Sequence, residues 1–141
     1  MLRRFCRVVR LVASLVFVTS VQADDLEIAV SQINSPEGHL LVQVLTEAAF
    51  KGEASASKSA RLAAQTGTLS LTIDSLEPGE YAVRVMHDEN DNGKLDSNLI
   101  GIPLEPWGFS NNAVGSFGPP GWKDVKFTLN GSHSVAIDLI H

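Results

Sequence analysis

Apolar and polar residues alternate with a period of two in several short segments of this chain, as in β-strands with one buried face. The alternation is clear in segments 26–31 and 68–74, and again in a strand that begins at Tyr81. Segment 38–46 is apolar on both faces, which is typical of a central strand. The residues expected to face the core from these four strands are Leu26, Ile28, Val30, Leu40, Val42, Val44, Leu69, Leu71, Ile73, Tyr81, Val83 and Val85.

Two further strands are expected near the end of the chain, over 123–129 and 133–140. Asn130-Gly131 lies between them, and this dipeptide is the strongest short signal for a β-hairpin. Six or more short strands with turn signals and no long helix predict an all-β fold. We therefore expect a single antiparallel β-sandwich of six to eight strands.

Two segments interrupt the regular strand pattern. Segment 48–65 is rich in Ala, Ser and Lys, and we expect a surface crossover there, either a loop or a short helix over 60–64. Segment 88–121 is expected to be one long loop after the fourth strand. A connection of this length in a small domain is usually functional or separately stabilised.

The start of the chain has the features of a secretory signal peptide. Four arginines precede an apolar run over 11–18 and the small-residue triplet 21–23, so cleavage is expected after Ala23. A membrane anchor is the alternative, but the run is too short to span a bilayer. We therefore expect a single domain over 24–141, periplasmic or secreted, with no transmembrane segment after cleavage.

Charge and cysteine content narrow the class of protein. The net charge of −5 falls to roughly −9 once the four leading arginines are removed, so binding to nucleic acid is not expected. The only cysteine, Cys6, lies in the predicted signal segment. The exported domain would therefore contain no disulfide and would depend on its core, with or without a bound metal.

Oxygen-bearing side chains alternate over 88–96, as they do in calcium loops of the EF-hand type. Gly93 falls at position 6 of such a loop, where the backbone turns sharply. Calcium is therefore the expected cofactor. The candidate ligands are Asp88, Asn90 and Asn92 at positions 1, 3 and 5, the main-chain carbonyl of Lys94 at position 7, and Asp96 at position 9.

The match to an EF-hand loop is incomplete. Position 12, which normally holds a bidentate Glu, is Leu99. Asn98 is a second candidate to complete the shell, and Leu95 is expected to tuck into the core. The alternative is a turn without an ion, because Asp, Asn and Gly favour tight turns on their own.

Aromatic residues are interleaved with Gly, Pro and Asn in the second half of the long connection. Exposed aromatic rings beside amide groups can stack on sugar faces, so a carbohydrate-binding module is one alternative function. The other interpretation is that the rings fold inward and form a small core beneath the loop. The candidate ligand surface consists of Trp107, Phe109, Asn111 and Phe117.

The sequence contains no arrangement typical of an enzyme. A nucleophile elbow and a phosphate-binding loop are both missing from it. Asp88, Asp91 and Glu105 could form a paired-carboxylate site, so a small periplasmic hydrolase is a further alternative, although so small a domain leaves little room for a substrate cleft.

Several motifs resemble a family of secreted bacterial proteins known only as domain of unknown function 2141. They are Pro78-Gly79-Glu80-Tyr81-Ala82-Val83, His87-Asp88 with Asn90 and Asn92-Gly93-Lys94-Leu95-Asp96, Gly101-Ile102-Pro103, Gly108-Phe109-Ser110-Asn111-Asn112 and Phe117-Gly118-Pro119-Pro120. The resemblance covers nearly all of the mature chain. It implies a small exported β-sandwich and no particular activity.

A wider resemblance is to transthyretin-like sandwiches, including carboxypeptidase regulatory domains and the calcium-binding B repeats of bacterial adhesins. It is carried by segment 76–83 and by the Asp-x-Asn-x-Asn-Gly pattern over 88–93. It implies a transthyretin-like, Ig-like Greek-key sandwich in which calcium stiffens the module. We therefore expect an exported, non-catalytic binding or accessory module for an unidentified envelope protein or glycan.

Overall fold

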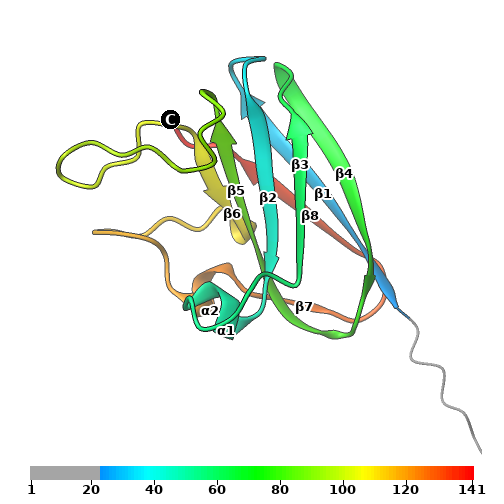
Figure 1. Cartoon of the computed structure of the whole chain (residues 1–141). Coiled ribbons are helices and arrows are strands. Elements are labelled where there is room, and N and C mark those ends of the chain that lie inside the picture. The colour runs from blue at the N-terminus through cyan, green and yellow to red at the C-terminus, as the bar shows by residue number, and fades with distance from the viewer. Residues whose placement is uncertain (1–22) are drawn as a thin grey trace, which may run out of the picture.

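The computed structural model describes residues 23–141, so the predicted signal segment up to residue 22 lies outside the described residues. The described part of the chain folds into two β-sheets packed face to face (Figure 1). This arrangement confirms the predicted all-β sandwich. Within residues 23–141, no helix is long and apolar enough to cross a membrane.

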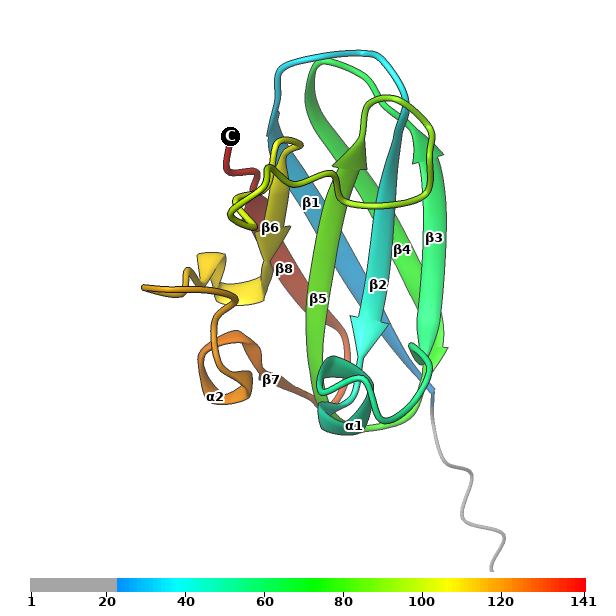
Figure 2. The ribbon, with the colours of Figure 1, turned by 60° about the vertical axis from the view of Figure 1, so that its left-hand side comes forward.

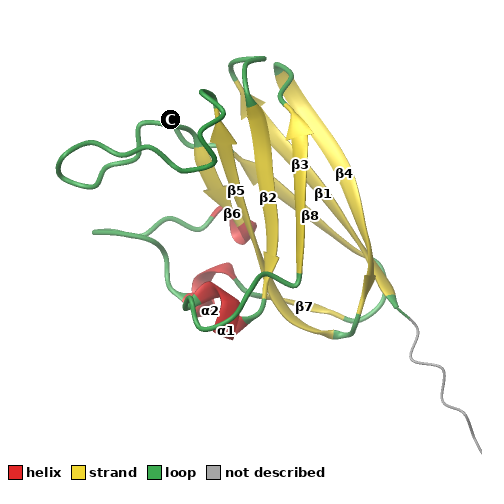
Figure 3. Ribbon diagram, in the orientation of Figure 1, coloured by secondary structure: helices red, strands yellow, loops and turns green. Residues whose placement is uncertain are grey.

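The two sheets contain eight strands. In the smaller sheet the order is β4 (Gly67–Leu76), β1 (Asp24–Ile33) and β8 (His133–Asp138). In the larger sheet the order is β3 (Lys58–Ala63), β2 (His39–Leu45), β5 (Gly79–Asp88) and β6 (Trp107–Phe109), and the short β7 (Phe127–Leu129) also pairs with β5. Among the described residues, three short helical turns lie outside the sheets (Figure 3), namely α1 (Glu47–Phe50), η1 (Ser110–Asn112) and α2 (Trp122–Val125).

Most neighbouring strands are antiparallel, as predicted, but β1 and β8 run parallel. Ile28 lies opposite Val135 in this pair, and the same residue lies opposite Leu71 of β4 on the other side. The parallel pairing is possible because β1 and β8 lie at opposite ends of the domain sequence and are not joined to each other by a tight turn.

The core lies between the inner faces of the two sheets. The period-two prediction is confirmed in four strands, because the residues predicted to face inward from β1, β2 and β5 are all buried, and those from β4 are buried or pack against the core. Burying a side chain such as Leu or Ile typically contributes about 1.5 to 3 kcal/mol, so this double layer is the main source of stability. The fully buried members include Leu26, Ile28, Val30, Leu40, Val42, Val44, Val83 and Val85.

The predicted crossover over 48–65 was wrong in part, because it contains the strand β3. Ala60 and Leu62 pack against the core from this strand, while Ser59 and Arg61 point to solvent. The small, helix-favouring residues hid the alternation, and pairing with β2 overrides their local preference. The long loop therefore follows the fifth strand and not the fourth.

The predicted hairpin at Asn130-Gly131 was also wrong. The strand before it, β7, pairs with β5 in one sheet, and the strand after it, β8, pairs with β1 in the other. The turn thus carries the chain across the sandwich. The first half of the predicted strand over 123–129 is the helical turn α2, which leaves only Phe127–Leu129 as strand.

Candidate functional site

The long loop after β5 begins with a buried carboxylate. Asp88 is the last residue of the strand and is almost fully buried. Its Oδ1 accepts a hydrogen bond from the backbone N–H of Asn92 at 3.1 Å, and its Oδ2 accepts one from Gly93 at 2.8 Å. Gly93 has a φ of 75°, a conformation that glycine adopts without strain. Asp88 therefore holds the sharp turn that the spacing predicted at position 6.

The other alternating side chains meet across the same turn. The Asn92 side-chain amide donates to both carboxylate oxygens of Asp96, at 2.9 Å each, and the Asn90 amide donates to Oδ2 of Asp96. The bonds from Asn92 and Asn90 hold the pKa of the Asp96 carboxyl below its ordinary value. The Oδ1 atoms of Asp88 and Asn90 both lie 3.1 Å from the Asn92 backbone nitrogen. The four side chains predicted as ligands are thus brought together.

This cluster has the donor chemistry of a hard cation site. Two carboxylates and two amides supply oxygen atoms, which suit calcium better than zinc or copper. In the part of the chain that the structure describes, no three His, Cys, Asp or Glu side chains come together as metal ligands. A cation here would therefore need the amide oxygens of Asn90 and Asn92, whose side chains now direct N–H groups at Asp96.

Glu105 organises the loop from its far end. Its side chain is buried, with 6% exposed. Its Oε1 accepts the N–H of Glu89 and its Oε2 accepts the N–H of Asp96, both at 3.0 Å. The sequence suggested Glu105 only as a member of a carboxylate pair. Its role in the loop was missed because nothing local marks a contact with residues so distant in the chain.

A second contact ties the loop to the edge of the larger sheet. In Figure 2 the loop that connects β5 to β6 lies in front of the larger sheet, and its residue Asp91 contacts β2 and β3. There Asp91 Oδ1 lies 2.5 Å from Nδ1 of His39 and 3.0 Å from a guanidinium nitrogen of Arg61. Asp91 therefore faces away from the predicted ligands. His39 and Arg61 were not among the predicted site residues.

The turn between β1 and β2 supports the start of the loop. The Nε2 atom of His87 lies 2.8 Å from the main-chain oxygen of Glu37. Gly38 has a φ of 68°, and a Cβ atom placed on it would lie 1.9 Å from the carbonyl oxygen of Asp88. The position of Asp88 thus depends on a glycine in the neighbouring turn.

The sequence set two expectations for the rest of the loop, at Leu95 and Asn98, and marked Leu99 as the departure from the EF-hand pattern. Leu95 was expected in the core, but it is exposed. Asn98 was a possible ligand, but its Oδ1 accepts the N–H groups of Ile100 and Ile102 at 3.0 Å and so closes the tip of the loop. Leu99, at the position of the missing Glu, is fully exposed at this tip.

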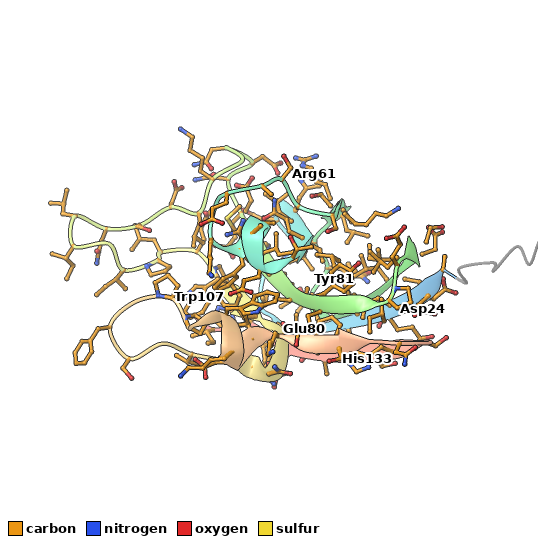
Figure 4. The ribbon with its side chains drawn as sticks, turned by 90° about the horizontal axis from the view of Figure 1, so that it is seen from below. Asp24, Arg61, Glu80, Tyr81, Trp107 and His133 are labelled. Carbon is orange, nitrogen blue, oxygen red and sulfur yellow. The ribbon has the colours of Figure 1, made fainter. Side chains whose placement is uncertain are left out.

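The predicted aromatic surface is divided between two places. Phe109 is buried in a second small core with Ala82 and Val125, and Trp107 packs against the same cluster. Figure 4 shows Trp107 near the base of two loops that project from the sandwich, the long loop after β5 and the loop between η1 and α2. This is the inward-folded arrangement that the sequence offered as an alternative. Phe117, by contrast, is fully exposed.

The polar residues around these aromatics hold the second core together. Asn111 donates its side-chain amide to the carbonyls of Asp124 and Lys126, at 3.0 Å each. The buried hydroxyl of Ser110 accepts the N–H of Val83 at 2.9 Å and donates to the carbonyl of Val125. Both side chains are therefore engaged in fixing the 3₁₀ turn η1 against α2 and β5.

Comparison with known proteins finds one family. A family model described as "Uncharacterized protein conserved in bacteria (DUF2141)" matches residues 28–137, which is nearly the whole of the described domain. Neither the curated proteins nor the solved structures contain a match to the chain.

Proposed function

The chain belongs to the DUF2141 family, and we propose that it is an exported, non-catalytic binding module whose loop over 88–96 holds calcium. The family has no assigned activity, so the proposal rests on the residues of this chain. The observation that carries it is the meeting of Asp88, Asn90, Asn92 and Asp96 across one turn, with the spacing of a calcium loop.

The loop backbone supports this proposal because its turn is already formed. Asp88 accepts N–H groups from positions 5 and 6 of the loop, and Glu105 holds the N–H groups of Glu89 and Asp96. Little further ordering of the backbone would be needed on binding, so less affinity would be lost to ordering. The two Asn side chains would turn their amide oxygens toward the ion, and the carbonyl of Lys94 would add a fifth ligand.

The ligand set favours a modest affinity. Only Asp88 and Asp96 bring negative charge, and position 12 brings none. Affinity in such loops rises with ligand charge, so a dissociation constant of about 0.1 to 1 mM is expected, as in extracellular calcium modules. This range suits a protein that the predicted signal segment would send to the periplasm or the cell exterior, where calcium is more abundant than in the cytoplasm.

A binding function is favoured over catalysis because the carboxylates of the loop are already engaged in hydrogen bonds and an ion pair. Asp88 and Glu105 each use both carboxylate oxygens to accept backbone N–H groups, and Asp91 is paired with Arg61. A hydrolase with this carboxylate set would need at least one of them directed at a substrate. The alternative of a carbohydrate-binding surface has less support than the calcium site, since Trp107 and Phe109 pack into the second core.

The partner that this module would bind is an envelope protein or glycan.

Thermal unfolding of the domain over 24–141 tests the calcium site. The two core clusters found among the described residues consist of side chains from this range, so the test uses the domain without the predicted signal segment. With about 10 mM calcium and the affinity above, linkage gives about 1.4 to 2.7 kcal/mol of stabilisation relative to chelator. For a domain of this size that corresponds to a rise of roughly 5 to 10 °C in melting temperature.

Two charge-matched variants make the test specific. Asp96→Asn removes a proposed ligand and should abolish most of the calcium shift. Asp91→Asn removes the same charge from the same loop at a side chain that faces Arg61, and it should leave the shift intact. The proposal fails if calcium stabilises the domain no more than magnesium does, or if the two variants respond equally.

A further inference from the structure

The tip of the long loop exposes a group of aliphatic side chains. Segment 97–104 contains no charged residue, and it projects from one side of the sandwich (Figure 1). Leu99 is fully exposed and Ile100 is 80% exposed, which is unusual for such residues in a soluble domain. The exposed apolar residues of this tip are Leu99, Ile100, Ile102 and Leu104.

Most backbone N–H groups of the tip are hydrogen-bonded within the loop itself. The Asn98 side chain accepts the N–H groups of Ile100 and Ile102, and its main-chain carbonyl accepts that of Gly101 at 3.0 Å. The N–H of Asn98 donates to the carbonyl of Ile102 at 2.9 Å. Leu104 donates to the carbonyl of Asp96, and Pro103 has no N–H. The tip thus presents aliphatic side chains while most of its N–H groups need no partner from outside.

A second loop projects on the same side. It lies between η1 and α2, and Figures 1 and 4 both show it beside the first loop. Segment 110–122 also lacks a charged residue. Val114 and Phe117 are exposed on it, and Phe117 completely so. Two uncharged segments with exposed apolar side chains therefore extend from one side of a domain whose net charge is strongly negative.

We propose that the tip over 97–104 inserts into the boundary between headgroups and acyl chains of a phospholipid bilayer. Hydrocarbon offers no hydrogen-bond partners, so a segment that reaches its boundary must bring N–H groups that are already bonded, as five of the seven in this tip are. The groove of a protein partner would impose no such requirement, because it can supply donors and acceptors of its own. The tip also projects from the sandwich (Figure 1), and a projecting tip suits a soft, deformable surface.

Charged residues lie at the base of the loop and uncharged apolar residues at its tip, which matches the polar headgroup layer and the apolar interior of a lipid bilayer. The charged residues Asp91, Lys94 and Asp96 lie at the base, where polar headgroups would surround them, and the tip beyond Asp96 carries no charge until Glu105. Because the domain is strongly acidic, zwitterionic lipids would bind it without the repulsion that anionic lipids would add. The inference stands on the tip and does not require calcium in the loop.

Sedimentation with phosphatidylethanolamine–phosphatidylcholine vesicles tests the insertion. The domain over 24–141 is used, because the apolar run over 11–18 would itself bind lipid. We expect the domain to partition onto the vesicles, and Leu99→Glu combined with Ile100→Glu to reduce the partition coefficient about tenfold or more. Both side chains are exposed, so the fold should be kept, and the unchanged melting temperature of the double variant checks this.

A second double variant controls for the added charge. Ser70→Glu with Ser132→Glu adds the same charge at exposed positions away from both loops, and it should bind vesicles as the parent domain does. Absence of vesicle binding by the parent domain, or equal binding by the two double variants, would overturn the insertion.

Repeating the sedimentation in calcium and in chelator separates this inference from the calcium proposal. Tip-dependent binding that is equal in both buffers would uphold insertion alone. A calcium-induced rise in melting temperature without vesicle binding would uphold the calcium site alone and refute insertion.

Discussion

The side chain of Glu105 accepts a hydrogen bond from the backbone N–H of Asp96, with 3.0 Å between Oε2 and the nitrogen, although nine positions separate the two residues. The same carboxylate accepts the N–H of Glu89 through its other oxygen. One buried side chain therefore connects the beginning and the end of the candidate calcium loop. The shape of the loop depends on it even if no ion is bound.

Glu105→Gln should destabilise the domain by about 1 to 3 kcal/mol. Glutamine offers one oxygen where the structure uses two, so one partly buried backbone N–H loses its acceptor. Urea denaturation measures the cost, and amide hydrogen exchange should show faster exchange at Glu89 or Asp96. The exposed Glu53→Gln serves as a control and should change stability by less than about 0.5 kcal/mol. A cost for Glu105→Gln as small as that of the control would show that the carboxylate does not hold the loop.

Asp88→Asn and Asp91→Asn should differ clearly in their effects. Asp88 is buried and accepts two backbone N–H groups, so its replacement should cost about 1 to 3 kcal/mol. Asp91 and Arg61 are about half exposed, and such surface pairs are worth about 0 to 1 kcal/mol. Chemical denaturation of both variants checks the difference. Equal costs would contradict the distinct roles of these two carboxylates.

Asp96 should make part of the stability of the loop dependent on pH. Hydrogen bonds from Asn92 and Asn90 lower its pKa below the ordinary value of 3.8. Because the folded-state pKa is the lower one, the stabilisation is fully present above the ordinary value and is lost as the pH falls through the folded-state pKa. An NMR titration of the carboxyl group should place its midpoint below 3.8. A midpoint at or above that value would contradict the contacts described.

Protonation of Asp96 should also reduce the stabilisation of the domain by calcium at acidic pH. A protonated Asp96 no longer attracts the ion, so the stabilisation by calcium should shrink over the pH range in which Asp96 titrates. Melting temperatures in calcium and in chelator across a pH series measure this. If the calcium shift is the same with Asp96 protonated as at neutral pH, Asp96 is not a ligand.

Gly38→Ala should be more damaging than Gly52→Ala, although both glycines have positive φ angles of 68° and 79°. A Cβ on Gly38 would meet the main-chain oxygen of Asp88 at 1.9 Å, whereas a Cβ on Gly52 would meet nothing within 4 Å. The Gly52 variant should lose about 1 to 2 kcal/mol from backbone strain alone. The Gly38 variant should lose more and should also weaken the calcium response. Equal losses in thermal unfolding would show that the turn can move away from Asp88.

Local pattern was sufficient for the strands whose inner residues are large. β1, β2, β4 and β5 repeat apolar residues with period two, and each was predicted. β3 was not, because Ala60 is a small inward residue in an Ala-rich segment and the strand depends on its pairing with β2. The turn at Asn130-Gly131 was placed correctly, but turn residues cannot specify which sheet the next strand joins.

Some residues of the candidate site could likewise be predicted from the sequence and others could not. Asp88, Asn90, Asn92 and Asp96 could be identified from sequence because a single turn brings alternating residues together, and residue spacing determines that geometry. Glu105, Arg61 and Gly38 could not, because they reach the loop from other parts of the chain.

The sequence by itself determined the sandwich, its main strands and the alternating oxygen groups of the loop, since these follow from backbone periodicity and short-range geometry. Only the tertiary structure decided which distant side chains hold the loop, which aromatic rings are buried, and that Leu99 and Ile100 are exposed at its tip. Such features depend on contacts between residues far apart in the chain, and no local pattern of residues encodes them.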